Sequence, residues 1–221
     1  MSFIDFISKI HKSTPRNYLQ RVVECDKAEC AAISKKFGFE YFDGDRKYGY
    51  GGYRYDGRWR AFAELIIQHY GLKPGHKVLD IGCGKGFLVK DLMEVLPGLD
   101  VYGIDISEYA IQNAMPEVKD RLRVGTAAQL PYGNQEFDCV LSINVLHNLL
   151  IYDLFTALRE IERVCRGKAK YIVVDGYRNE REKTNLVYWQ LTCECFYRPE
   201  EWEWIFQQTG YQGDYGCVYF Q

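Results

Sequence analysis

The amino-acid sequence predicts an α/β protein in which helices cover a doubly wound, largely parallel sheet. The main observation is an apolar strand, Val78–Ile81, that runs directly into glycines at positions 82, 84 and 86. An amphipathic helix follows, with apolar residues at helical spacing from Phe87 to Leu96. A second apolar strand then ends in Asp105. This strand–turn–helix–strand order is typical of a βαβ unit, and therefore of a parallel sheet.

The glycine turn indicates a ligand site. Glycine lets a ligand approach the backbone, and the helix start that follows presents free N–H groups and the positive end of its dipole. The loop reads G-x-G-x-G, whereas the dinucleotide fingerprint requires G-x-G-x-x-G. Asp105 comes nineteen residues after Gly86. In a βαβ unit this spacing places its carboxylate beside the turn, where it can accept hydrogen bonds from two ribose hydroxyls.

Two motifs together, D-I-G-C-G-K-G at residues 80–86 and G-I-D-I-S at residues 103–107, resemble those of class I methyltransferases that use S-adenosylmethionine. The resemblance extends from about Tyr55 to the C-terminus, and the alternative is another Rossmann-like domain. It implies a Rossmann-like sheet of seven strands whose last strand runs antiparallel. It also implies S-adenosyl-L-methionine as the cofactor. We expect two closing strands, at residues 211–214 and 216–220.

The same resemblance implies which residues hold the cofactor. Many relatives have an aspartate that accepts from the adenine amino group where this chain has Thr126, and a hydroxyl accepts more weakly than a carboxylate. Backbone groups of Ala127 and apolar packing are the expected substitute. The implied cofactor-binding residues of the sheet region are Asp80, Gly82, Cys83, Gly84, Asp105, Ile106, Thr126, Ala127 and Asn144.

Residues 41–59 read YFDGDRKYGYGGYRYDGRW, in which aromatic residues alternate with glycine, aspartate and arginine. Tyrosines supply apolar area and a hydroxyl, and glycines permit closure, so we expect this segment to fold as a lid over the cofactor. By the resemblance, Tyr53 and Arg58 are candidates to bind the cofactor, whose carboxylate suits an arginine fork. Tyr50 is a candidate substrate-binding residue. The alternative is a packing loop of stacked tyrosines.

The composition of the whole chain limits the function classes. The chain has 221 residues, with 28 Lys plus Arg against 30 Asp plus Glu, and it therefore has no overall positive field to recruit nucleic acid. Eight cysteines occur without a zinc-like C-x-x-C pair or a signal peptide, so we expect reduced thiols in a cytoplasmic protein. No apolar run reaches the length of a membrane span, and no ligand cluster indicates a metal.

The expected organisation has two parts. Residues 1–59 form an N-terminal helical extension with the aromatic lid, and residues 60–221 form the S-adenosylmethionine-binding methyltransferase domain. Within the extension, residues 2–42 have the apolar spacing of amphipathic helices. One interpretation is a capped surface helix with solvated charges. The other is that three cations, Lys12, Arg16 and Arg21, help hold an anionic acceptor.

Two polar residues follow neighbouring strands of the predicted sheet. His147 comes after the fourth strand, at residues 137–144, and Asp175 ends the fifth, at residues 171–175. Ligands of open α/β sheets bind beyond the carboxyl ends of strands, so both side chains can reach one pocket. The pair resembles bases of sugar and natural-product O-methyltransferases, and we expect His147 to act as general base with Asp175 as its orienter. Alternatively, His147 merely packs behind the cofactor.

The acceptor is expected to be a small molecule. Tyr188 and Trp189, in the segment after the fifth strand, are candidates to line its pocket, with helix packing as the alternative. We predict O-methylation of a hydroxylated small molecule, such as a sugar derivative. Alternatives are N-methylation of a small metabolite, RNA or protein, and a non-catalytic module that binds S-adenosylmethionine. The N-P-P-Y type of signature is absent because Asn144 is followed by Val145. The oligomeric state is not encoded in any motif of the chain.

Overall fold

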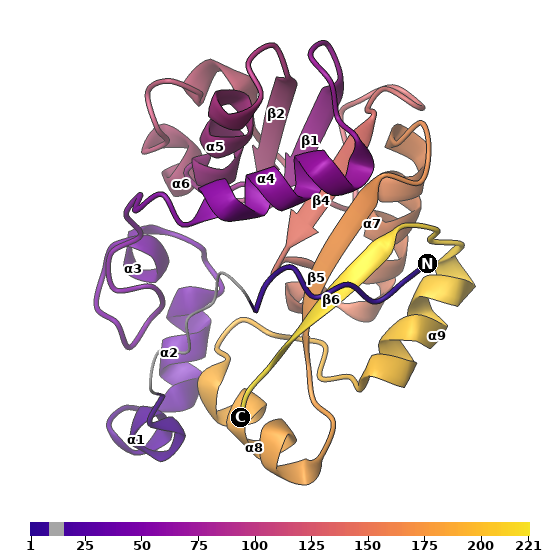
Figure 1. Cartoon of the computed structure of the whole chain (residues 1–221). Coiled ribbons are helices and arrows are strands. Elements are labelled where there is room, and N and C mark those ends of the chain that lie inside the picture. The colour runs from indigo at the N-terminus through magenta and orange to yellow at the C-terminus, as the bar shows by residue number, and fades with distance from the viewer. Residues whose placement is uncertain (9–15) are drawn as a thin grey trace.

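The computed structural model describes residues 1–8 and 16–221. In this part of the chain, six strands form one sheet in the order β3-β2-β1-β4-β5-β6 (Figure 1). The strands are β1 (Lys77–Ile81), β2 (Asp100–Asp105), β3 (Leu122–Val124), β4 (Cys139–Ile143), β5 (Lys170–Gly176) and β6 (Asp214–Tyr219).

Every pair of neighbouring strands is parallel, and the sheet reverses its winding between β1 and β4. The interior strand β5 is buried along its whole length, which explains its nearly continuous apolar sequence, since parallel strands carry helices on both faces. In such a sheet the carboxyl ends of β1 and β4 border a crevice at the point of reversal, which is where ligands bind.

The helices cover both faces of the sheet (Figure 1). One face packs against α4 and α5, and the opposite face packs against α7 and α9. The helices are α1 (Tyr18–Val23), α2 (Lys27–Ser34), α3 (Phe39–Phe42), α4 (Trp59–Tyr70), α5 (Phe87–Val95), α6 (Glu108–Gln112), α7 (Ile151–Val164), α8 (Glu180–Trp189) and α9 (Pro199–Thr209), with short 3₁₀ turns η1 (Lys119–Arg121) and η2 (Leu146–Asn148).

The α/β class and the doubly wound sheet are confirmed, but the expected seventh, antiparallel strand is wrong for the described residues. The chain leaves β5, passes through α8 and α9, and returns as β6 parallel to β5. Residues 211–213, expected in a closing strand, instead form a turn. The Tyr211 hydroxyl donates to the carbonyl of Asp214 at 2.8 Å, and Gly213 is packed so tightly that a Cβ there would lie 2.4 Å from that hydroxyl.

The first residues also differ from expectation, because the segment from Phe3 to Ile7 is not helical. It runs beside β6 (Figure 1), where the N–H of Ile4 donates to the carbonyl of Tyr215 at 2.8 Å. Phe6 and Ile7 are buried in the core between the sheet and α4. Burial of these side chains and pairing with a strand edge therefore outweigh the local helical spacing. Thr14, Pro15 and Lys12 lie outside the described residues.

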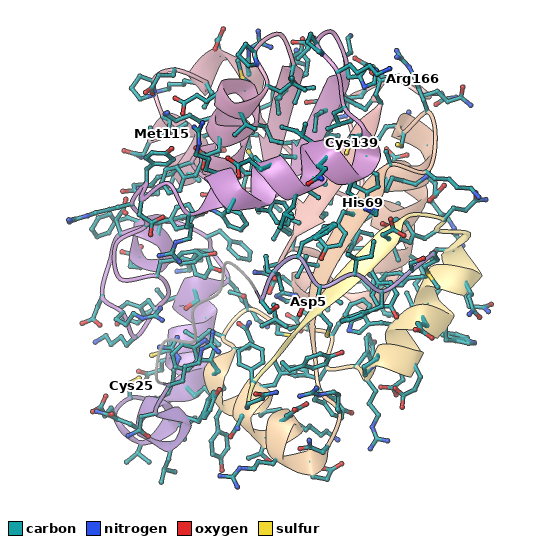
Figure 2. All side chains as sticks on the ribbon, in the orientation of Figure 1. Asp5, Cys25, His69, Met115, Cys139 and Arg166 are labelled. Atoms are coloured by element: carbon teal, nitrogen blue, oxygen red, sulfur yellow. The ribbon has the colours of Figure 1, made fainter. Side chains whose placement is uncertain are left out.

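The rest of the extension is helical but divided. Asn17 caps α1, Asp26 caps α2, and Gly38 precedes α3. Such side-chain caps satisfy N–H groups that a helix start leaves unpaired, so each cap begins a new short helix instead of continuing the previous one. On the main domain, α4 docks against the sheet edge through His69, whose Nε2 lies 3.2 Å from Oδ2 of Asp214 (Figure 2).

The contact between Tyr171 and the N-terminal segment can be tested by Tyr171→Phe. The Tyr171 hydroxyl donates to the carbonyl of Ile4 at 2.7 Å and accepts from the N–H of Phe6 at 3.4 Å, and the residue is fully buried. Removing the hydroxyl leaves both backbone groups unpaired, so we expect a loss of about 1–3 kcal/mol in the free energy of unfolding. Hydrogen exchange at the amides of Ile4 and Phe6 should accelerate.

Tyr211→Phe is the matched control, because it also removes a hydroxyl that donates to a backbone carbonyl. It should destabilise the protein without changing exchange at residues 4–6. If Tyr171→Phe leaves the protection of these amides unaltered, the hydroxyl does not dock the segment.

Candidate active site

A first cavity lies at the carboxyl ends of β1, β2 and β4, at the reversal point of the sheet. It includes nearly all the residues that the sequence assigned to the cofactor, together with Tyr50. These are Tyr53, Asp80, Gly82, Cys83, Gly84, Asp105, Ile106, Thr126, Ala127 and Asn144. Residues that lie far apart in the sequence therefore line one and the same cavity.

Two glycines with left-handed backbone conformation and hydrogen bonds to the end of β2 determine the shape of the glycine loop. Gly82 has φ 80° and Gly84 has φ 55°, a region that other residues seldom adopt. A Cβ at Gly82 would lie 2.0 Å from Cγ2 of Val145. The N–H groups of Gly82 and Cys83 both donate to the carbonyl of Ile104, at 2.7 and 3.2 Å. The loop is thus closed onto β2 while its surface stays open to a ligand.

Asp105 is fixed by the same loop. Its Oδ2 accepts from the N–H of Gly84 at 2.7 Å, and its Oδ1 accepts from the N–H of Ser107 at 2.8 Å. Burial raises the pKa of Asp105, although the two N–H donors oppose that shift. Because a carboxylate oxygen has two lone pairs, each can accept a further hydrogen bond from a ligand hydroxyl.

Asp80, at the end of β1, is almost completely buried and lines the first cavity. Burial, and then the negative charge of Asp105, raises its pKa to about 7. A cation placed in the cavity would favour the ionised form, because opposite charge stabilises a carboxylate. The two neighbouring acids thus make this end of the cavity suited to a positively charged ligand.

Asn144, directly after β4, carries two signs of a functional position. Its φ is 59°, a strained value that non-glycine residues hold mainly where the surrounding structure imposes it. Its Oδ1 is buried and accepts no hydrogen bond in the described part of the chain. A buried acceptor without a donor is costly, which indicates that a ligand N–H or O–H satisfies it.

The aromatic segment, residues 41–59, lies over the glycine loop. The ring of Tyr53 stacks on Phe87 at a centroid distance of 4.7 Å and reaches the loop beside Gly84. Beneath it, Nζ of Lys85 lies 2.5 Å from Oδ2 of Asp43. These contacts place the segment at the mouth of the cavity.

Asp43 is the anchor of this segment. Its Oδ2 also accepts from the Tyr109 hydroxyl at 2.6 Å, and its Oδ1 accepts from the N–H of Tyr53 at 3.0 Å. Burial alone would raise the pKa of Asp43, but donation by Lys85, Tyr109 and Tyr53 outweighs burial and lowers it. The anchor therefore joins the N-terminal extension to the start of α5 and to α6.

A second cavity adjoins the first and shares with it Tyr41, Tyr50, Asn144 and Asn148. Its remaining lining is mostly polar and comes from the extension, from η2 and β5, and from the segment around α8. These residues are Arg16, Arg21, Arg46, Gly49, Arg58, His147, Asp175, Trp189, Gln190, Leu191, Thr192, Val218 and Phe220. A molecule in this cavity can reach the first one past Asn144.

His147 and Asp175 meet in the second cavity, and both are 2% exposed. Nε2 of His147 lies 3.3 Å from Oδ2 of Asp175, and Nδ1 accepts from the backbone N–H of Asp175 at 3.0 Å. This pattern places the imidazole proton on Nε2. Burial lowers the pKa of His147, opposed by the charge of Asp175, so the ring is neutral. Both ring nitrogens therefore face Asp175, one its backbone and the other its carboxylate.

Two other predicted residues, Arg58 and Tyr188, lie outside the cavities where we expected them, and a third, Thr126, lies in the expected cavity with its hydroxyl already engaged. Arg58 does not line the first cavity; it pairs with Asp56 at the surface, 2.5 Å away, and borders the second cavity. Tyr188 lies outside both cavities, whereas its neighbour Trp189 lines the second. Thr126 faces the first cavity, but its Oγ1 already accepts from the N–H of Ala128 at 3.2 Å.

Several lining residues escaped the sequence analysis. Asn148 lines both cavities, and its Oδ1 accepts from the Thr192 hydroxyl at 2.8 Å. Gln190 donates through Nε2 to Oδ2 of Asp175. The recurrence of asparagine four residues after Asn144, one helical turn on, was a usable signal for Asn148. Nothing local distinguished Gln190 or Thr192, because only the return of the segment after α8 brings them to the site.

Sequence comparison places this geometry in a known family. Residues 79–173 match the family described as a methyltransferase domain. An uncharacterized methyltransferase of Synechocystis is 31% identical over 129 residues, which cover 58% of each chain. A 2-phytyl-1,4-naphtoquinone methyltransferase of Trichormus variabilis is 28% identical over 144 residues, covering 61% of this chain and 62% of that protein. The match thus spans about three fifths of the length of these two relatives.

This match makes residues 79–173 a methyltransferase domain, for which S-adenosylmethionine is the cofactor. Solved structures share its fold. A methyltransferase of Haloferax volcanii, in complex with the Trm112 activator, gives a TM-score of 0.56 at 24% identity and covers 69% of this chain and 67% of its own. The YcgJ protein of Bacillus subtilis gives 0.55 at 21% identity, covering 66% of both chains.

Among residues 1–8 and 16–221, histidine, cysteine and acidic side chains form no cluster of three that could hold a metal ion. Over the same ranges, each helix is too short or too polar to cross a bilayer. All eight cysteines are free thiols.

The pKa of Asp80 predicts how cofactor binding depends on pH. S-adenosylmethionine is cationic at its sulfonium and ammonium groups, so its binding favours the ionised carboxylate, which Asp80 reaches only above a pKa of about 7. We expect about tenfold tighter binding at pH 8 than at pH 6, measured by calorimetry. By linkage, the ligand-free protein loses stability as the pH rises from about 4 to 7, because the unfolded chain releases this proton first.

Asp80→Asn should remove most of the pH dependence of binding. Asp91→Asn is the control, since Asp91 on α5 is also buried but accepts from the Tyr55 hydroxyl and does not line the cavity. An affinity in the wild type that stays constant from pH 6 to 8 would contradict the role of Asp80.

Lys85→Met tests the anchor of the aromatic segment. The methionine preserves much of the side-chain volume but removes the charge that faces Asp43, a partly buried carboxylate. We expect a loss of about 1–3 kcal/mol in unfolding free energy and faster hydrogen exchange across residues 41–59. Lys77→Met is the control, because Lys77 pairs with Glu136 only loosely, at 3.9 Å on the surface. Equal exchange in wild type and Lys85→Met would rule out the anchor.

Proposed function

We propose that this protein transfers a methyl group from S-adenosylmethionine to a hydroxyl of a small polar molecule, such as a sugar derivative. The observation that carries the proposal is the junction of the two cavities at Asn144. One cavity has the glycine loop and paired acids of a cofactor site, and the other has a buried His147–Asp175 pair. An acceptor and a cofactor can therefore meet at a place that excludes water.

In the proposed cofactor site, the charges and the available hydrogen-bond acceptors match the groups of S-adenosylmethionine. Asp105 would accept from the ribose hydroxyls, and the backbone around Gly82 and Gly84 would contact the methionine part. Asp80 and the orphaned Oδ1 of Asn144 provide acceptors for a cationic ammonium group. Thr126 and Ala127 would lie beside the adenine. Tyr53, above the glycine loop, would cover the bound molecule, and the aromatic segment would act as its lid.

The cofactor supplies an electrophilic methyl group, and the remaining work is positioning and proton removal. An alcohol oxygen becomes strongly acidic as it forms its bond to carbon, so a carboxylate is a sufficient base. We assign that role to Asp175, in place of His147. The proton passes from the acceptor oxygen to a carboxylate oxygen of Asp175. His147 and Gln190 position this carboxylate through their contacts with Oδ2.

The lining of the second cavity supports a polar acceptor. Asn148, Thr192 and Gln190 offer amide and hydroxyl groups, which can recognise the hydroxyls of a sugar-like molecule. Related proteins are named for small molecules, among them a phytyl-naphtoquinone and geranyl diphosphate. A small-molecule acceptor agrees with those names, although the polar lining here favours a more hydrophilic compound.

The activity can be tested by incubating the protein with a metabolite extract and isotopically labelled S-adenosylmethionine, and searching by mass spectrometry for products that gain one methyl group. With the acceptor identified, Asp175→Asn should lower kcat by about 10²-fold or more, a typical contribution of a general base. Cofactor affinity should change little. A protein that binds the cofactor but methylates nothing would be a binding module.

His147→Gln separates the two possible bases. If Asp175 is the base, the variant retains turnover, with a modest fall in kcat and an unchanged pH profile. If His147 is the base, kcat of the wild type falls at low pH through the histidine pKa, and this limb disappears in His147→Gln along with most of the activity. Methyl transfer to an amine, which needs less help from a base, would leave kcat nearly unchanged in Asp175→Asn.

A further inference from the structure

The second cavity contains four arginines and, among the described residues, one carboxylate, Asp175. Resting on the proposed function, we propose that the acceptor carries a phosphate or diphosphate group, which Arg16, Arg21 and Arg46 bind. The substrate class is then a hydroxylated, phosphorylated small molecule. The argument depends on the placement, the charge and the remaining donors of these three side chains.

The three guanidinium groups gather around one indole ring. Their central carbons lie 5.2, 4.8 and 5.3 Å from the ring centroid of Trp189 for Arg16, Arg21 and Arg46 respectively. Arg16 also lies 5.1 Å from the ring of Phe220. The arginines come from three segments: the approach to α1, α1 itself and the loop after α3. The three arginines thus come together beside α8 and form one positively charged wall of the second cavity.

Among residues 1–8 and 16–221, no carboxylate forms an ion pair with Arg16, Arg21 or Arg46. In the described part of the chain, the contacts of these arginines are aromatic rings and backbone carbonyls. Arg21 donates to the carbonyls of Trp189 at 3.1 Å and Arg46 at 3.0 Å, and Arg46 donates to the carbonyl of Gly49. Carbonyls orient a guanidinium but leave its charge intact, and an arginine has five N–H donors. Donors and charge therefore remain for a ligand.

The closeness of the arginines contributes to lower pKa values of Arg21 and of the neighbouring Lys27. Burial, and then the charge of Arg46, lowers the pKa of Arg21. Burial, and then the charge of Arg21, lowers the pKa of Lys27 to about 8. Like charges held together destabilise the folded state unless an anion joins them. A bound anion would offset the part of both pKa shifts that comes from like charge.

A phosphate-type group fits this wall better than a single carboxylate. Planar guanidinium forks bind phosphate oxygens in pairs, and three of them match the multiple negative oxygens of a phosphate or diphosphate. A carboxylate has two oxygens and one charge, so it would leave most of the positive charge unbalanced. Because Asp175 lines the same cavity, the anionic group and the reacting hydroxyl can belong to one small molecule.

The alternative is that the arginines only attach α1 to α8. This role accounts for Arg21, whose nitrogens bond to two carbonyls. It accounts less well for Arg16, whose contacts in the described residues are two aromatic rings. Arg178 provides a comparison, because it stacks on Tyr219 at 4.1 Å and is also paired with a carboxylate, that of Glu182. Arg178 therefore serves as the control for stacking without a free charge.

The first test measures binding of inorganic phosphate and pyrophosphate to the full chain by calorimetry. We expect saturable binding of pyrophosphate, weakened about tenfold or more in Arg16→Gln and Arg46→Gln. Arg16→Lys should recover part of the affinity because it keeps the charge but loses the fork. Arg178→Gln should bind as the wild type does. Equal binding of pyrophosphate by wild type and both glutamine variants, or stronger binding of acetate, would overturn the proposal.

The second test uses the methyl-transfer screen, with half of the metabolite extract treated first with phosphatase. The proposal expects the methylated product only in the untreated half. With the acceptor in hand, Arg16→Gln should raise KM about tenfold or more and leave kcat nearly unchanged. A product that survives phosphatase treatment, with KM unaffected by Arg16→Gln, refutes the phosphate while leaving methyl transfer intact. Methylation of added RNA in place of any metabolite would also refute it.

If no substrate is methylated in either half, although the cofactor binds, the proposed function itself fails. The calorimetric result then still decides whether the arginines form an anion site. The two failures are thus distinguishable, because one concerns turnover and the other concerns binding of a defined anion.

Discussion

The rest of the site depends on the hydrogen bonds that attach the glycine loop to the end of β2. Two consecutive N–H groups of the loop donate to the carbonyl of Ile104, and a third donates to the carboxylate of Asp105. The loop therefore has no freedom to collapse into the space where a ligand would lie. The same bonds place Asp105 beside Asp80, and their mutual repulsion in a buried setting makes this end of the cavity selective for positive charge.

The N-terminal extension completes the site instead of merely preceding it. Through Asp43 it is joined to Lys85 in the glycine-loop region and to Tyr109 on α6. Through its arginines it is joined to Trp189 on α8. Each cavity takes part of its lining from this extension and part from the sheet. The arginines of the second cavity come from the extension, whereas the glycine loop and the acids of the first cavity come from the strand ends.

The sequence predicted that His147 and Asp175 lie close together, but their geometry suggests other roles than the predicted ones. Successive placement after neighbouring strands brings the two side chains together, as the topology predicted. In the structure, however, both imidazole nitrogens face Asp175, because Nδ1 accepts from its backbone N–H and Nε2 lies 3.3 Å from Oδ2 of its carboxylate. We therefore propose that the histidine positions the carboxylate and that the aspartate takes the proton from an acceptor.

The sequence by itself determined the features that depend on neighbouring residues. The apolar strand before Gly82, the helix after Gly86 and the carboxylate at Asp105 are encoded in local spacing, and these suffice for the α/β class and the position of the cofactor region. Local spacing misled at Phe3–Ile7, where a helical pattern is overridden by pairing with β6 and by burial of Phe6. It also overcounted the strands, because Tyr211 and Gly213 pack as a turn.

Only the tertiary structure decided which distant residues meet. Arg16, Arg46 and Trp189 converge across the length of the chain, and Arg58 turns to Asp56 instead of the cofactor region. Such contacts depend on how whole segments pack against one another, and they cannot be predicted from the spacing of apolar residues in the sequence. The direction of a hydrogen bond at His147 is likewise invisible in a sequence, because it is set by the atoms that the fold places around the ring.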